Sequence, residues 1–205
     1  MMTSSHVTPC GLPGIGPVPV GMHSCHFYSD RQQLIDALVP YTIAGLQANE
    51  RCILIAAQPL PARELIRELQ AGWDGADDAM QRGALRVLDF DRWYMGASGL
   101  KSEDIVRLWL QEEALALMDG FSGLRVSGNI SFLQPDQWPA FMAYEKSVSA
   151  NFAKRRIVAL CSYVLDGCTA DQRDQVLRAH SCAFEQHDRD WQVVTTGPSV
   201  LGPSV

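Results

Sequence analysis

The sequence has little positive charge and no long apolar run. Its 17 lysine and arginine residues are outnumbered by 23 aspartate and glutamate residues, which gives a net charge of −6. Because an acidic surface repels phosphate groups, we do not expect direct binding of nucleic acid. No apolar stretch approaches the roughly 20 residues of a membrane helix, and the first residues do not resemble a signal peptide. We therefore expect a soluble, cytoplasmic protein without membrane contact.

The six cysteines lack the close C-x-x-C spacing of many metal sites. Cys52 and Cys161 stand inside the short apolar runs CILIAA and IVALC, where a thiol behaves as a small buried apolar group. Without a secretory signal, thiols stay reduced. We expect free cysteines rather than disulfides.

Apolar residues make up 47% of the chain, which is enough for one packed domain. Residues 1–22 are rich in glycine and proline without helical or strand periodicity, which predicts a flexible arm. Residues 23–194 are predicted to form a single domain. Residues 195–205 include the tandem repeat GPSVLGPSV and are predicted to form a flexible tail.

Short apolar segments alternate with amphipathic segments throughout the predicted domain. Strands are predicted at 25–28, 52–57, 85–90, 124–128 and 157–163, with a short edge strand at 191–194. This alternation predicts an α/β fold, with a mostly parallel central sheet of five or six strands and helices on both faces.

Two helix starts carry the capping-box pattern, in which a short polar residue is followed three positions later by glutamine. The first pair is Asp30 and Gln33, and the second is Thr169 and Gln172. The second helix is predicted to extend far enough to carry Ala183 and Phe184 on its inner face.

Ligands bind beyond the carboxyl ends of the strands in sheets of this kind. Asn129 is the preferred polar residue there, because Gly128 permits close approach and an amide both donates and accepts hydrogen bonds. Trp93 either walls a pocket or plugs the core, and Arg125 either binds an anion or forms an ion pair with Asp89 or Glu145. The residues predicted to bind a ligand are Tyr28, Asp30, Trp93, Tyr94, Arg125, Asn129 and Tyr163.

The stretch HSCHFYSDRQQLIDALVPYTIAGLQANERCILIAA resembles the opening of the MEDS domain, a sensory domain named for methanogens, methylotrophs and the dichloromethane-responsive regulator DcmR. The resemblance spans about residues 14–191 and implies a three-layer fold similar to RecA/KaiC-like P-loop proteins. Later landmarks that fit the family are Trp93-Tyr94, Gly123-Leu124-Arg125, Gly128, Tyr144-Glu145, Leu160-Cys161-Ser162-Tyr163 and His180.

P-loop proteins place G-x-x-x-x-G-K-[ST] between the first strand and first helix, where backbone N–H groups and the lysine hold phosphates. Residues 28–33 of this chain read YSDRQQ instead, without glycine or lysine and with the added carboxylate of Asp30. The segment GLPGIG at residues 11–16 precedes the first strand and also lacks the lysine. The resemblance therefore implies a degenerate relative, and we expect no ATPase activity, no enzyme function and no cofactor.

The leading hypothesis is a non-catalytic sensory domain that binds a small organic ligand at the C-terminal edge of the sheet. The family resemblance implies a one-carbon derivative as one ligand class and transcription regulation as one setting. Family members often join this domain to a helix-turn-helix or a kinase, and neither is recognisable in this sequence. We therefore expect the signal to pass to a partner protein or through a homo-oligomer.

Two alternatives remain open. One is an enzyme or nucleotide-binding protein with a modified phosphate site. The other is a metal- or thiol-based redox sensor that uses His23, Cys25, Cys161 and His180, because His23 and Cys25 share one face of a strand. The interpretation that we favour is that these side chains only pack in the core, and it predicts no metal.

Overall fold

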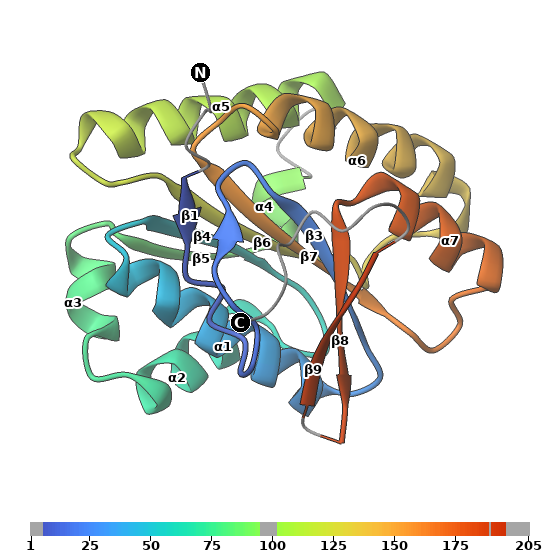
Figure 1. Cartoon of the computed structure of the whole chain (residues 1–205), viewed down its shortest axis with the longest axis horizontal. Coiled ribbons are helices and arrows are strands. Elements are labelled where there is room, and N and C mark those ends of the chain that lie inside the picture. Colours follow the sequence, from blue (N-terminus) through green and yellow to red (C-terminus); the bar gives the residue numbers. More distant parts are fainter. Residues whose placement is uncertain (1–5, 95–101, 189, 196–205) are drawn as a thin grey trace.

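A computed structural model of the chain describes residues 6–94, 102–188 and 190–195. Its centre is a seven-stranded sheet in the order β5-β4-β6-β7-β3-β8-β9, and every neighbouring pair is parallel except β8 and β9 (Figure 1). The α/β fold with a mostly parallel sheet is confirmed. The strands are β3 (His23–Tyr28), β4 (Arg51–Ala56), β5 (Leu85–Asp89), β6 (Leu124–Asn129), β7 (Ile157–Val164), β8 (Cys182–His187) and β9 (Asp190–Val194).

Helices cover both faces of this sheet, which gives the predicted three layers. Figure 1 shows α1 (Arg31–Gln47), α2 (Ala62–Gly72) and α3 (Ala76–Gln81) on one face. The opposite face carries α5 (Ser102–Met118), α6 (Trp138–Phe152) and α7 (Ala170–Ala179). The short helix α4 (Phe90–Tyr94) follows β5, and the 3-10 turn η1 (Pro135–Gln137) precedes α6.

The core consists of two apolar clusters, one on each face of the sheet. Leu34 and Leu65 pack with Leu54 on the α1 face. Trp109 and Val126 pack together on the α6 face. Because side chains of a strand alternate between faces, each buried strand contributes to both clusters.

One of the two predicted capping boxes is complete, and the other forms in part. The Asp30 carboxylate accepts a hydrogen bond of 2.9 Å from the backbone N–H of Gln33, whose side chain accepts one of 2.9 Å from the N–H of Ser29. At the start of α7, Thr169 and Gln172 form the complete capping box, in which each side chain accepts a hydrogen bond from the backbone N–H of the other residue. These caps fix where two of the helices begin.

The sheet is larger than predicted because β8 replaces the end of a predicted helix. Helix α7 ends at Ala179, and the backbone N–H of Ser181 donates a 2.7 Å hydrogen bond to the carbonyl of His23. Beyond that point Ala183 and Phe184 point to opposite faces of the sheet. Strand β8 pairs with the free edge of β3 on one side and with β9, its hairpin partner, on the other. Local sequence does not reveal these backbone partners.

The predicted flexible arm is wrong for residues 6–22. Strand β1 (Val7–Thr8) pairs antiparallel with β2 (Val18–Pro19), and Leu12 and Val18 are 2% and 0% exposed. Gly11 has φ +92° and lies so close to α1 that a Cβ atom there would be 2.4 Å from the Pro40 carbonyl oxygen. Turn residues separate the buried side chains of Leu12 and Val18, so the segment buries them without regular periodicity. The predicted tail at 195–205 lies, beyond residue 195, outside the described residues.

Two further sequence expectations concern thiols and membranes. All six cysteines are free thiols, as predicted. Among the described helices, none has both the length and the apolar character to cross a membrane.

Candidate functional site

The residues predicted to bind a ligand do not form one site, because they face opposite layers. Tyr28 packs in the α1-face cluster and contacts Asn129, whereas Tyr163 packs in the α6-face cluster. All three lie toward the carboxyl ends of their strands, as predicted. The alternation of side chains along each strand separates them.

Tyr28 and Asn129 lie together, but their polar atoms bind protein groups. The Tyr28 hydroxyl donates a 2.9 Å hydrogen bond to Asn129 Oδ1. Asn129 Nδ2 donates to the backbone carbonyls of Ala57 and Gln58 at 3.1 and 3.0 Å. The preferred polar pocket residue therefore connects β3 and β6 to the segment that follows β4.

Three other predicted residues have local roles or lie outside the description. Asp30 is exposed at the N-cap of α1. Trp93 is 7% exposed and packs on Trp109 with ring centroids 4.2 Å apart, as expected for a core plug rather than a pocket wall. The side chain of Tyr94 lies outside the described residues.

A groove opens on the α6 face at the carboxyl ends of β6 and β7. Its volume is about 180 Å³, and Trp138 and Tyr163 line it with ring centroids 6.5 Å apart. Ser131, Gln134 and Gln172 add polar groups to the lining. Of the residues predicted to bind a ligand, Tyr163 lines this groove.

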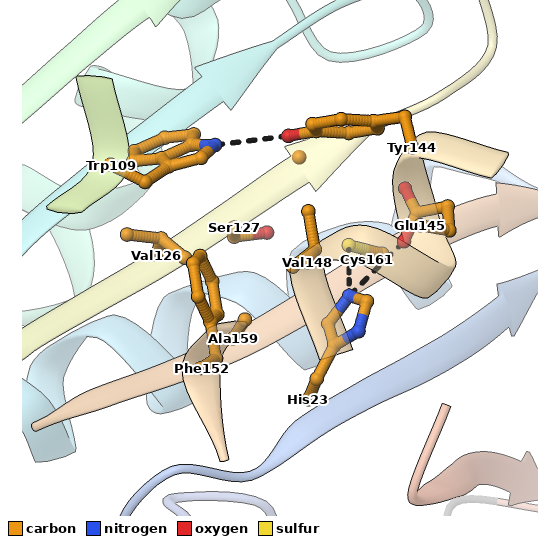
Figure 2. Close-up of a pocket in the computed structure, with 11 residues that line it drawn as sticks. His23, Trp109, Val126, Ser127, Tyr144, Glu145, Val148, Phe152, Ala159 and Cys161 are labelled. Atoms are coloured by element: carbon orange, nitrogen blue, oxygen red, sulfur yellow. Dashed lines mark hydrogen bonds and ion pairs between the residues drawn. The ribbon is translucent and has the colours of Figure 1, made fainter. Parts of the chain in front are cut away.

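Deeper under the same face, four chemically reactive side chains converge from four segments, and Figure 2 shows His23, Glu145 and Cys161 among them. Nε2 of His23 lies 3.1 Å from Glu145 Oε2, and Nε2 of His180 lies 3.2 Å from the same oxygen. Sγ of Cys161 lies 3.3 Å from His23 Nε2. All four ligand atoms lie within 4.8 Å of one another, and Figure 2 shows Glu145 and Cys161 turned toward His23. We call these four residues the buried cluster.

Hydrogen bonds outside the buried cluster determine which imidazole nitrogens carry hydrogen. His180 Nδ1 lies 2.8 Å from the Val176 carbonyl, which only accepts, so this nitrogen must donate. His23 Nδ1 lies 2.7 Å from Ser149 Oγ, and the Ser149 hydroxyl donates its hydrogen to the Ala179 carbonyl at 2.5 Å. His23 Nδ1 therefore also donates. When an imidazole with this tautomer is neutral, its Nε2 has a lone pair directed into the cluster.

Burial changes the ionisation of the cluster. Burial, reinforced by nearby His180, lowers the pKa of His23 to about 4. Burial acts to raise the pKa of Glu145, but the adjacent imidazoles of His180 and His23 outweigh it and bring this pKa to about 2. Burial and the adjacent Glu145 raise the pKa of Cys161 well above its ordinary value. The cluster thus contains a buried carboxylate, and no lysine or arginine of the described residues pairs with it.

The structure brings together part of the alternative set of metal ligands. His23, Cys161 and His180 do come together, although their elements are far apart in the sequence. Cys25 lies on the same strand face as His23, but its thiol donates to the Cys182 carbonyl at 3.7 Å and is not in the cluster. Glu145 takes the fourth place.

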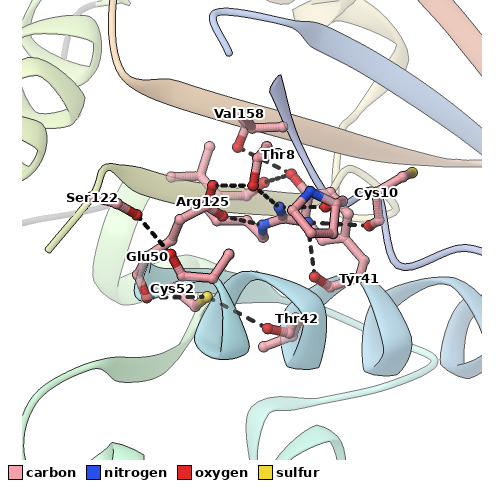
Figure 3. A network of polar contacts seen from close by, with 12 residues as sticks. Thr8, Cys10, Tyr41, Thr42, Glu50, Cys52, Ser122, Arg125 and Val158 are labelled. Carbon is pink, nitrogen blue, oxygen red and sulfur yellow. Dashed lines mark hydrogen bonds and ion pairs between the residues drawn. The ribbon is translucent and has the colours of Figure 1, made fainter. Parts of the chain in front are cut away.

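Arg125 is not near the carboxyl edge, and its predicted partners were wrong (Figure 3). It lies at the amino end of β6 on the α1 face. Glu145 belongs to α6, which covers the opposite face. Its Nε donates to Glu50 Oε2 at 2.5 Å, and its other nitrogens donate to the carbonyls of Pro9, Cys10 and Tyr41. The side chain is 1% exposed, so these groups enclose it completely. Arg125 attaches the N-terminal segment to the sheet.

A comparison with known protein families identifies the family of this chain. The profile of MEDS, the MEthanogen/methylotroph, DcmR Sensory domain, matches residues 22–181. The chain belongs to the MEDS family. Among curated proteins, none matches this sequence. The crystal structure of a KaiC-like protein from the hyperthermophilic archaeon Pyrococcus horikoshii OT3 is similar with a TM-score of 0.63 at 11% identity, covering 92% of this chain and 85% of that one. That likeness supports a RecA-like fold for the MEDS domain.

Sequence analysis missed two features of this MEDS domain. Trp138, which lines the groove, precedes Pro139 at a helix start and carries no distinguishing local pattern. The sequence offers Glu145 as an ion-pair partner for Arg125 and predicts no role for Ser149. The i, i+4 spacing of Glu145 and Ser149 places both on one helical face, and this signal could have paired them.

Proposed function

We propose that this MEDS domain is a non-catalytic sensory domain that binds a small organic ligand in the groove at the carboxyl ends of β6 and β7. The observation that supports this proposal is the groove itself. Its volume of about 180 Å³ is below the roughly 300 Å³ at which sites for drug-sized molecules begin. It suits a compound of a few non-hydrogen atoms, such as a one-carbon derivative.

The groove offers both kinds of contact that a small polar organic molecule needs. The rings of Trp138 and Tyr163 provide apolar surface, while Ser131, Gln134 and Gln172 provide donors and acceptors. An apolar wall with a few polar groups is the usual composition of a small-molecule site.

The segment between β3 and α1 supports the proposal that this domain does not bind or hydrolyse a nucleotide. In a P-loop protein the backbone N–H groups at this helix start face phosphates. In this chain the N–H of Gln33 is bound by the Asp30 carboxylate and that of Ser29 by the Gln33 side chain. A triphosphate would have to displace both caps and approach a negative charge.

The output is proposed to pass to a partner protein or to a second copy of the chain. Trp138 belongs to the start of α6, and Gln172 belongs to the start of α7. A ligand between them contacts both helices and alters their relative position. Both helices lie in the outer layer on this face of the sheet, where another protein can detect the change (Figure 1).

The test uses saturation-transfer NMR with dichloromethane, methanol and formate as one-carbon probes on the full chain. Replacing Trp138→Ala is expected to weaken binding by about 1–3 kcal/mol, because one wall of apolar contact is lost. Trp73→Ala is the matched control, since Trp73 packs against the α1-face cluster away from the groove.

Two results would contradict this proposal. If wild-type protein binds none of the probes saturably, the one-carbon ligand class is wrong. If a probe binds and Trp138→Ala affects it no more than Trp73→Ala does, the groove is not the site.

A further inference from the structure

The side chains of the buried cluster direct several ligand atoms at one region. The lone pairs of two imidazole nitrogens and a carboxylate oxygen are directed at one region, with nitrogen–oxygen distances of 3.1 and 3.2 Å. Glu145 Oε2 and His180 Nε2 both lack a regular hydrogen bond within the described residues. A buried carboxylate without a compensating charge is strongly destabilising, so either protons or a cation must occupy this region.

We propose that the buried cluster is a metal site for a transition-metal cation of the zinc class, ligated by His23, Glu145, Cys161 and His180. Two imidazoles, a thiolate and a carboxylate are a donor set typical of Zn²⁺. The proposal does not depend on ligand binding in the groove, because none of the four side chains lines it.

The spacing of the donor atoms suits a tetrahedral ion. Bonds of about 2.0–2.3 Å to zinc place tetrahedral ligand atoms about 3.3–3.6 Å apart. The closest pairs in the cluster are 3.1 to 3.3 Å apart, and every pair lies within 4.8 Å. Small rotations of the side chains suffice to surround one ion.

The outer hydrogen bonds also match those of a metal site. Metal-binding histidines usually donate their other ring N–H to a carbonyl or another acceptor, which orients the ring and fixes the tautomer. His180 does so to the Val176 carbonyl, and His23 does so to Ser149. Ser149 is in turn held by the carbonyl of Ala179. Each Nε2 therefore stays available for an ion.

Space for one further small ligand adjoins the cluster. A cavity of about 20 Å³ is lined by His23, Glu145 and Cys161, together with apolar residues of β6 and α6. This volume is sufficient for about one water molecule. A metal ion in the cluster would therefore have room for an exchangeable ligand on the cavity side.

The first experiment measures metal binding by the full-length wild-type chain after removal of metals with a chelator. Titration with Zn²⁺ in a calorimeter is expected to show equimolar binding. Titration with Co²⁺ is expected to produce the visible bands of tetrahedral cobalt and a thiolate charge-transfer band. Absence of Zn²⁺ binding, or Co²⁺ spectra without the thiolate band, would overturn the proposal, since protons alone would then occupy the cluster.

Substitutions in the buried cluster identify which side chains bind the metal ion. Cys161→Ser is expected to remove the thiolate band, and Glu145→Gln, which has nearly the same shape, is expected to abolish equimolar binding. Ser149→Ala is expected to weaken Zn²⁺ affinity about 10–100-fold, because it releases the orientation of His23.

Cys25→Ser is the matched control. Cys25 is fully buried on the strand beside Cys161 and pairs with it in register, but lies outside the cluster. It should retain the thiolate band and the wild-type affinity. If Cys25→Ser loses the band while Cys161→Ser keeps it, the ligand set is wrong. Circular dichroism of each variant separates ligand loss from unfolding.

Discussion

At the scale of single residues, Arg125 shows how one buried charge organises a distant segment. Its guanidinium donates to Glu50 and to the carbonyls of Pro9 and Cys10, while lying 4.5 Å above the Tyr41 ring. A planar fork with five donors can satisfy several such acceptors at once. The arginine therefore donates hydrogen bonds to backbone carbonyls that have no partner in regular secondary structure. These carbonyls would otherwise need water as a donor.

Replacing Arg125→Ala is expected to lower the free energy of unfolding by about 3–5 kcal/mol, because Glu50 is left buried without its partner. Urea denaturation followed by circular dichroism measures the change. Arg82→Ala is the matched control, since the Arg82–Asp78 pair is exposed and should contribute less than about 1 kcal/mol. Equal losses in the two variants would mean that the buried network is not stabilising.

At the scale of elements, the N-terminal segment belongs to the core rather than to a flexible arm. Leu12 packs in the α1-face cluster, and the short pair of β1 and β2 returns the chain toward β7, where the N–H of Gly21 donates to the Ile157 carbonyl. Its proline and glycine residues form turns rather than a disordered segment. Composition alone therefore misjudged an element in which a few apolar residues, such as Leu12 and Val18, are fully buried.

Leu12→Ala is expected to destabilise the protein by about 2–5 kcal/mol, the usual loss for a leucine removed from a core. Leu115→Ala on α5 is the control, because Leu115 is 48% exposed and its truncation should change stability by less than about 0.5 kcal/mol. Thermal or urea unfolding of both variants compares them. A Leu12→Ala protein as stable as the control would restore the flexible-arm interpretation.

At the scale of the whole molecule, the chain has a RecA-like sheet but not the phosphate-binding loop of P-loop proteins. We expect no saturable binding of a fluorescent ATP analogue in the presence of Mg²⁺, because Asp30 occupies the N-terminus of α1 and no lysine follows it. Fluorescence anisotropy measures this, with unlabelled ATP as competitor. Micromolar binding that ATP competes away would favour the nucleotide-binding alternative.

The sequence by itself determined the layers of this MEDS domain and several helix starts. Alternating apolar segments, the Asp30–Gln33 pair and the Thr169–Gln172 pair are local signals, since strand period and capping depend on residues a few positions apart. These parts of the fold were predicted correctly for that reason.

Only the tertiary structure decided the buried cluster and the extent of the sheet. His23 and Cys161 are 138 positions apart and meet because β3 pairs with β7, while β8 forms because β3 has a second free edge. Periodicity encodes which face a side chain occupies but not which strands are neighbours. The choice of Glu145 over Cys25 as the fourth member follows from where α6 crosses the sheet, and that position depends on packing along the whole chain.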